Sequence, residues 1–224
     1  MKLITFQSMD ALDYLLTNGY LICDDSKIEK DKYGIPYEFI ISKMNERVDN
    51  KDNIKYPIWC WVKCYNGICP PKVKCKNDVD FKVKITFHKE EKEVFITDYR
   101  RYSFVLNNEY IASSLKERKA FEKELEEKNI TREDLKAYVR RDKYKNYRKD
   151  KTFKEICDKI KLSFDKCITK DSNILQGCVW KINLDDIEKI EIIKDSEYVY
   201  GNLNYIRKNG ERMNWIEDYY KRIK

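Results

Sequence analysis

The stretch from Tyr56 to Cys64, Tyr-Pro-Ile-Trp-Cys-Trp-Val-Lys-Cys, constrains the fold more than any other part of the chain. Pro57 suits the first residue of a strand, because it fixes the backbone there without removing a hydrogen bond that the ladder needs. Since side chains alternate along a strand, Trp59 and Trp61 share one face and the residues between them share the other. Both faces are apolar, which is typical of a strand that is covered on each side. We therefore expect a central strand with other elements packed over its two indoles.

Length and composition indicate a globular chain with a heavily charged surface. The 224 residues are 42% hydrophobic and 38% charged, and a chain of this size can bury a sizeable core. The net charge of +7 arises from 46 basic and 39 acidic residues. Most of these charges can cancel locally, so a lysine-rich solvated surface explains the excess better than an anionic partner does.

Several classes of protein are excluded by what the sequence lacks. No stretch approaches the ~20 apolar residues that a membrane span needs, and the first residues are too short an apolar run for a signal peptide. We therefore expect a cytoplasmic protein with no membrane partner, whose eight cysteines are reduced thiols. The single histidine, His88, excludes Ser-His-Asp hydrolases, multi-histidine zinc sites and His-x-Glu deaminases.

The spacing of apolar residues predicts a single α+β domain over residues 1–224, with a mixed, mostly antiparallel central sheet and flanking helices. Ser8 and Gly19 mark the two ends of the first expected helix. Residues 79–87 and 94–97 are expected to form a hairpin, and a last strand pair is expected from 176–180 and 181–184. The other expected strands are residues 2–7, 20–23 and 187–193. The expected helices are residues 9–18, 37–48 and 152–168, with a C-terminal helix within 201–224. Polar loops are expected at residues 24–26 and 34–36.

Residues 113–150 differ in character from the rest of the chain, and we interpret them as a charged helical insertion. Ser114 and the capping box Thr131–Asp134 mark the starts of two helices with thin apolar stripes. Residues 140–151 then hold seven basic side chains. These could contact phosphates while tyrosines stack on bases. A solvated helix face explains them better, because the acidic residues from Glu122 to Glu127 just upstream would weaken a basic field. The residues predicted to bind nucleic acid are Arg140, Arg141, Lys143, Tyr144, Tyr147 and Arg148.

Four cysteines within sixteen positions have enough thiolates to bind zinc. Their separations lack the Cys-x-x-Cys spacing of a zinc knuckle, so we expect buried reduced thiols rather than a metal site. These residues are Cys60, Cys64, Cys69 and Cys75.

Polar side chains at the ends of the expected strands form a third candidate site, because sheet-based sites gather their ligand contacts there. The alternative at each position is an ordinary strand-end residue bonded to the backbone. The six residues are Thr5 and Gln7 at the end of the first strand, Tyr56 before the central strand, Tyr102 and Asn107 after the hairpin, and Gln176 at the start of the last strand pair.

Six motifs follow one another along residues 3–193: Thr5-Phe-Gln7, Leu15-x3-Gly19-x-Leu21, Tyr56-Pro-Ile-Trp59-x-Trp61, Thr97-Asp98-Tyr99, Val105-Leu106-Asn107 and Gln176-x3-Trp180. In this order the chain resembles a bacterial domain of unknown function, family DUF3841. That family has Trp-His before the Val-Leu-Asn motif, where this chain has Tyr102-Ser103. The resemblance implies no established activity.

A more distant similarity is to ADP-ribosyltransferase folds, which open with a polar residue on the first strand, a helix and Gly-x-Leu. The similarity implies NAD or a related nucleotide, bound in a cleft between the first and last strands. Gln7 and Gln176 would be the catalytic residues, with Gln176 in the place of a catalytic glutamate. A neutral amide does not supply the charge of a carboxylate, so weakened or altered catalysis is expected. The residues implied to bind the cofactor are Thr5, Tyr56, Tyr102 and Asn107, with Tyr56 or Tyr102 stacked on the nicotinamide ring.

Two functions therefore stay open. The first is an ADP-ribosyltransferase-like enzyme. The second is a non-catalytic module that binds nucleic acid or protein through the basic helical arm.

Overall fold

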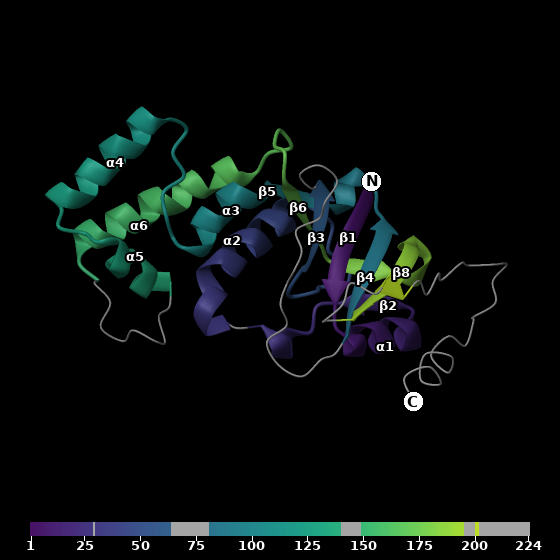
Figure 1. The fold of residues 1–224 in the computed structure, drawn as a ribbon. Helices are drawn as coiled ribbons and strands as arrows, with labels where there is room; N and C mark the ends of the chain where they lie inside the picture. Colours follow the sequence, from purple (N-terminus) through teal and green to yellow (C-terminus); the bar gives the residue numbers. More distant parts are fainter. Residues whose placement is uncertain (29, 64–80, 140–148, 195–199, 202–224) are drawn as a thin grey trace.

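A seven-stranded sheet lies on the right of Figure 1, and several of the helices extend from it to the left. The computed structural model describes residues 1–28, 30–63, 81–139, 149–194 and 200–201. Each strand pairing in these residues is antiparallel, and a separate ribbon pairs β2 (Tyr20–Ile22) with β7 (Lys181–Asn183). In order across the sheet, the strands are β5 (Phe95–Asp98), β6 (Leu175–Val179), β3 (Ile58–Lys63), β1 (Lys2–Gln7), β4 (Phe81–His88), β8 (Ile187–Lys194) and β9 (Tyr200–Gly201).

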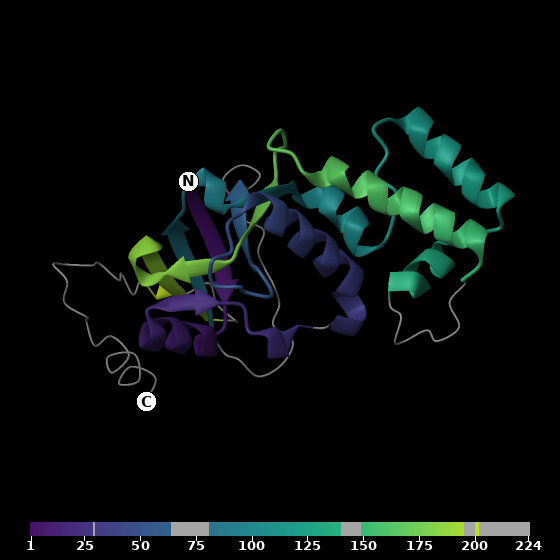
Figure 2. The same cartoon turned by 180° about the vertical axis from the view of Figure 1, so that it is seen from behind.

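Helices flank this sheet, so the predicted α+β class is confirmed. The second helix lies between the sheet and the last three helices, which extend away from the strands (Figures 1 and 2). The helices are α1 (Met9–Asn18), α2 (Lys30–Arg47), α3 (Tyr99–Leu106), α4 (Leu115–Glu127), α5 (Arg132–Val139) and α6 (Lys151–Ser163), with 3-10 turns η1 (Asp25–Lys27), η3 (Glu91–Glu93), η4 (Phe164–Cys167) and η5 (Leu184–Asp186).

The double-tryptophan strand β3 lies inside the sheet between β1 and β6, as its two apolar faces predict. Ile58 and Cys60 are buried on one face, in a core with α1 and the β2–β7 ribbon. Trp59 packs on the other face, against a core built from α2 to α6. The sheet therefore separates two hydrophobic cores.

Short sequence signals at helix ends are confirmed. The Ser8 hydroxyl accepts from the Ala11 amide at 3.2 Å at the start of α1, and Gly19 ends this helix with φ of 79°. Ser114 caps α4 in the same way, through the amide of Glu117. The two hydroxyls accept from backbone amides that have no partner within the helix. Gly19 adopts the left-handed conformation with which helices commonly end.

The capping box before α5 is confirmed, although aspartate replaces the usual glutamate. Thr131 and Asp134 exchange hydrogen bonds, with the Asp134 amide donating to the Thr131 hydroxyl at 3.1 Å and the Thr131 amide donating to the carboxylate at 2.8 Å. Asn129, just before it, takes a positive φ of 50° and turns the chain between α4 and α5.

Three expectations about connections and boundaries are wrong. The hairpin of β4 and β5 does not form, because both sides of β4 are taken by β1 and β8, and β5 pairs with β6 at the far edge instead. The expected pair of β6 and β7 is divided between the sheet and the β2–β7 ribbon. The loop predicted around Gly34 and Pro36 is part of α2. Burial of Ile35, Ile40 and Met44 there outweighs the missing hydrogen bond of the proline.

The described part of the predicted insertion is fixed to the body by both packing and charge. Phe121 of α4 stacks on Tyr110 with ring centroids 4.3 Å apart. Glu117 accepts hydrogen bonds from Lys166 at 2.7 Å, from the Tyr110 hydroxyl at 2.5 Å and from the Ser113 amide at 2.6 Å. These donors lower the pKa of Glu117 to about 2. The hydrogen bond to the Glu117 carboxylate, with burial, raises the pKa of Tyr110 to about 12.

Other segments fall outside the described residues. The predicted basic run 140–148 and all but the first residue of the expected C-terminal helix 201–224 belong to them. Among the helices that are described, none is long and apolar enough to cross a membrane.

Replacing Gly19 by alanine is expected to lower the free energy of unfolding by about 1 kcal/mol, because a Cβ is strained at positive φ. Gly34→Ala is the matched control: its added methyl meets nothing within 4 Å inside α2, so roughly 0.5 kcal/mol of stabilisation is expected there. Urea titration measures both. Equal effects at the two sites would contradict this account of Gly19.

Glu117→Gln is expected to remove an acid-sensitive part of the stability. The folded pKa is about 2 and the ordinary value is 4.5, so the carboxylate contributes fully above pH 4.5, and the contribution is lost as the pH falls through about 2. The gap in thermal midpoint between wild type and variant should narrow from pH 6 to pH 3. The exposed Glu126→Gln serves as the control, and a gap that does not change with pH would refute the prediction.

Candidate functional site

A cavity of about 740 Å³ opens where β1 ends, and we call it the β1-end cavity. Its wall combines the ends of β1 and β2 with the starts of α1 and β3, the turn η1 and one side chain of α2. Small-molecule sites commonly have volumes of ~300–1,000 Å³, so this cavity is large enough for a nucleotide. The lining side chains that determine its chemistry are Gln7, Asp10, Asp24, Asp25, Tyr37 and Trp59.

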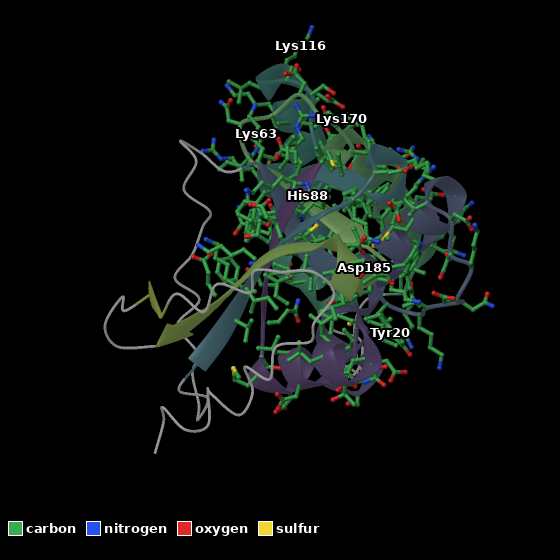
Figure 3. All side chains as sticks on the ribbon, turned by 90° about the vertical axis from the view of Figure 1, so that its right-hand side faces the viewer. Tyr20, Lys63, His88, Lys116, Lys170 and Asp185 are labelled. Atoms are coloured by element: carbon green, nitrogen blue, oxygen red, sulfur yellow. The ribbon has the colours of Figure 1, made fainter. Side chains whose placement is uncertain are left out.

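Strand direction explains why these segments meet. Because β3 runs antiparallel to β1, the start of β3 lies beside the end of β1. The chain leaves β1 directly into α1, turns at Gly19 and comes back through β2, whose last residues also line the cavity. Figure 3 labels Tyr20 at the start of this returning strand, near α1 and far from Lys116 of α4.

Gln7 is held in place by a hydrogen-bond relay. Its Nε2 donates to Oγ1 of Thr5 at 2.7 Å, and the Thr5 hydroxyl donates to the carbonyl oxygen of Trp59 at 2.8 Å. Thr5 is only 1% exposed and does not line the cavity. Thr5 therefore positions Gln7, whereas the sequence predicted direct contact between Thr5 and the cofactor.

Tyr37 and Trp59 form an aromatic wall. Their ring centroids lie 6.5 Å apart at an interplanar angle of 74°. Tyr37 also meets the edge of Tyr56, at 5.6 Å and 89°. Such edge-to-face contacts hold the rings in fixed orientations. Tyr37 lines the cavity and Tyr56 does not, so the predicted stacking residue Tyr56 supports the wall from behind.

The cavity has an acidic character. Asp10, Asp24 and Asp25 line it, and its described lining residues include no lysine, arginine or histidine. Asp24 is held by the amide and the hydroxyl of Ser26, at 3.0 and 2.6 Å. Asp25 also pairs with Lys55, whose Nζ lies 3.8 Å from its carboxylate, so part of this negative charge is compensated. The remaining surface favours a neutral or cationic group over an anionic one.

The one thiol in the wall is not a nucleophile near neutral pH. Burial, with the nearby charges of Asp24 and Asp25, raises the pKa of Cys23 to about 11. A thiol is reactive as the thiolate, which is scarce four units below its pKa. The chemistry of the cavity therefore rests on its carboxylates, aromatic rings and amide.

Gln176 is not part of the β1-end cavity. It stands opposite Trp61, which in turn stands opposite Ile4, so these three side chains share one face of the sheet. Gln7 is three residues beyond Ile4 and points to the other face, since side chains alternate. The expected cleft that joins Gln7 to Gln176 is therefore not formed, because β3 and its packed side chains lie between them.

Tyr102 and Asn107 also lie away from the cavity lining. Tyr102 is 4% exposed, its hydroxyl donates to the carbonyl of Pro36 at 3.4 Å, and burial raises its pKa well above the usual range. It is a core residue under Trp59, with ring centroids 4.9 Å apart. Asn107 is the exposed C-cap of α3, where its Nδ2 donates to the carbonyl of Ser103 at 2.8 Å.

The four cysteines that were weighed as zinc ligands and expected to be reduced thiols are divided by the limits of the described residues. Cys60 is buried in β3, and burial raises its pKa; Cys64, Cys69 and Cys75 lie outside the described part of the chain. Within the part that is described, no cluster of three or more histidine, cysteine, aspartate or glutamate side chains could hold a metal. The predicted nucleic-acid residues from Arg140 to Arg148 are outside it as well.

A second cavity, of about 650 Å³, lies at the other end of α2 and mixes both signs of charge. Lys89 is nearly buried there, between Asp186 at 2.8 Å and Glu93 at 3.3 Å, and Lys181 pairs with Asp52 at 2.9 Å. The β1-end cavity is the larger of the two and has the aromatic pair Tyr37 and Trp59 in its wall, so it is the better candidate for a ligand.

Sequence reasoning missed Tyr37 and the carboxylates Asp24 and Asp25. Tyr37 was expected to begin a helix, and the two aspartates were interpreted as part of a polar loop. A usable signal was present, because an Asp-Asp pair follows the short strand β2 after one residue, Cys23. Polar residues at a strand end are the same criterion that selected Thr5 and Gln7.

Gln176→Met is expected to leave the free energy of unfolding unchanged or to raise it by up to about 1 kcal/mol. The Gln176 Nε2 is buried and has no hydrogen-bond partner among the described residues, so removing it relieves a desolvation cost. Ser163→Ala is the comparison: this buried hydroxyl accepts from the Ile111 amide at 2.9 Å, and its loss should cost about 1–3 kcal/mol. Urea titration of both variants checks the contrast, and a large loss in Gln176→Met would contradict it.

Comparison with known proteins gives one match. A family model described as "Domain of unknown function (DUF3841)" matches residues 2–190. No curated protein and no solved structure matches the chain. The matched segment contains all of β1 to β7, and with them every wall of the β1-end cavity. Since the match spans most of the 224 residues, the chain belongs to the DUF3841 family.

Proposed function

We propose that the β1-end cavity binds NAD or a related nucleotide, in an ADP-ribosyltransferase-like domain. The observation that carries the proposal is the combination, in one nucleotide-sized cavity, of an aromatic wall, a fixed amide and three carboxylates without a cationic side chain among the lining residues. This combination suits the nicotinamide ring and its ribose, since the ring is flat and positively charged in NAD.

The chemistry of transfer assigns roles to the lining residues. Breaking the bond between nicotinamide and ribose develops positive charge on the ribose, so a nearby carboxylate accelerates the step if its interaction strengthens in the transition state. Asp10, Asp24 and Asp25 are the carboxylates that line the cavity. In this proposal they supply the charge that the resemblance assigned to Gln176, and Gln7 orients the ribose.

The test is isothermal titration of the full chain with NAD. Binding is expected at up to millimolar NAD, and Tyr37→Leu should weaken it by about tenfold, because the ligand loses a ring to pack on. Gln176→Met is the matched control: Gln176 does not line the cavity, so the affinity of this variant should equal that of wild type.

Two results would overturn the proposal. The first is the absence of heat and of a thermal shift with millimolar NAD. The second is a loss in Gln176→Met as large as that in Tyr37→Leu, which would place the ligand elsewhere. A thermal unfolding curve of each variant, measured without NAD, shows that any loss of binding does not come from loss of the fold.

A further inference from the structure

We propose that single-stranded nucleic acid binds on the face of the sheet around Trp61, outside the β1-end cavity. Its bases stack on the rings of Trp61 and Tyr99, and its phosphates meet lysine and arginine side chains. The proposal does not depend on NAD binding, because neither ring lines the β1-end cavity. We call this site the Trp61 surface, and its members are Lys2, Ile4, Trp61, Lys63, Lys84, Tyr99, Arg100 and Lys189.

The registers of three strand pairings build this surface. Ile4 is opposite Trp61 on one side and opposite Thr86 on the other. Thr86 is in turn opposite Lys189. Directly opposed side chains share a face, so these four form one row across β3, β1, β4 and β8. Neighbouring strands are ~4.8 Å apart, which makes the row about 14 Å long.

The described helices cover only part of this face. Trp59 and its cross-strand neighbours Cys178 and Phe95 belong to the core with α2 to α6. Two residues further along their strands, Ile4 and Trp61 are half-buried and belong to neither core. An apolar surface that is left partly open in this way is a candidate contact for a partner.

Two aromatic rings meet at one end of the row. Tyr99, the first residue of α3, lies against Trp61 with ring centroids 5.0 Å apart at an interplanar angle of 57°. Tyr99 is 42% exposed. Aromatic side chains on the face of an antiparallel sheet are a common platform for unpaired bases, since each base has a flat face that can stack on a ring.

Two cations adjoin these rings. Lys63 follows Trp61 by two residues on β3, and Arg100 follows Tyr99 directly on α3. Both side chains are exposed, and neither forms an ion pair with a carboxylate of the described residues. They are therefore available to phosphate groups.

The cations on β1, β4 and β8 are only partly neutralised. Lys2 pairs with Glu188 at 2.6 Å, while Lys84 and Lys189 share Glu191 at 3.0 and 2.8 Å. Together with the two cations beside the rings, five basic side chains meet two carboxylates, an excess of three positive charges among the described residues of this surface. Such a surface attracts a polyanion.

Rings and charges together favour a single strand over other anions. An acidic peptide would use the cations and leave the rings without a partner. In a duplex the bases stack on one another and are closed to the rings, whereas a single strand offers both base faces and phosphates.

The test is fluorescence anisotropy of labelled 20-nucleotide oligo(dT) and oligo(rU) with the full chain, in about 50 mM salt. Tyr99→Ala is expected to weaken binding by about tenfold through lost stacking, and Tyr99→Phe to preserve it. Lys63→Gln with Arg100→Gln should also weaken binding by about tenfold and lower the slope of log affinity against log salt by roughly 1.4, because two phosphate contacts are lost.

The matched control for charge is Lys116→Gln with Lys119→Gln. Both side chains are exposed on α4, which extends away from the sheet in Figure 1. This pair removes the same charge and should change the affinity by less than about twofold. Thermal unfolding of every variant, measured without nucleic acid, shows that the comparison is made on folded protein.

Four results would overturn the proposal. They are no binding of either oligonucleotide, equal weakening in the two paired lysine and arginine variants, full binding by Tyr99→Ala, and tighter binding of a duplex than of the single strand. Tyr37→Leu separates this site from the β1-end cavity, because Tyr37 lines only the latter. Nucleic-acid binding should be unchanged in that variant, and a loss as large as in Tyr99→Ala would move the nucleic acid to the cavity and refute the Trp61 surface.

Discussion

The antiparallel pairing of β1 with β3 is the constraint on which the rest of the structure depends. The register that sets Ile4 opposite Trp61 decides which side chains enter each of the two cores, since a shift by one residue would exchange the faces. The same register brings the start of β3 to the end of β1, and so places Trp59 beside Gln7. Fold and candidate site therefore follow from one strand pairing.

Features that depend on neighbours in sequence could be predicted. The alternation in β3 and the caps at Ser8 and Ser114 appear as expected. Each is set within a few residues, by side-chain period or by the unsatisfied amides of a helix end. That is the range over which a single sequence carries a clear physical signal.

Features that depend on distant partners were harder to predict. β5 pairs with β6 because both sides of β4 are already paired with β1 and β8. The local sequence around β5 does not indicate which strand is its partner. Gln176 was placed in a shared cleft because it opens a strand. Whether Gln176 and Gln7 point to the same face of the sheet depends on the registers of two strand pairings, β1 with β3 and β3 with β6. Asp24 and Asp25 became visible as site residues only when the turn after β2 was seen to border the cavity.

The seven-stranded sheet ends at one side in β5, which has four residues, all buried, and which passes directly into α3. At the other side, the described chain ends the sheet in the two residues of β9. A row of open amides is what allows one protein to add its strand to another and begin a fibril. Because β5 is so short and is followed at once by α3, a further strand finds little backbone on which to align at that edge of the sheet.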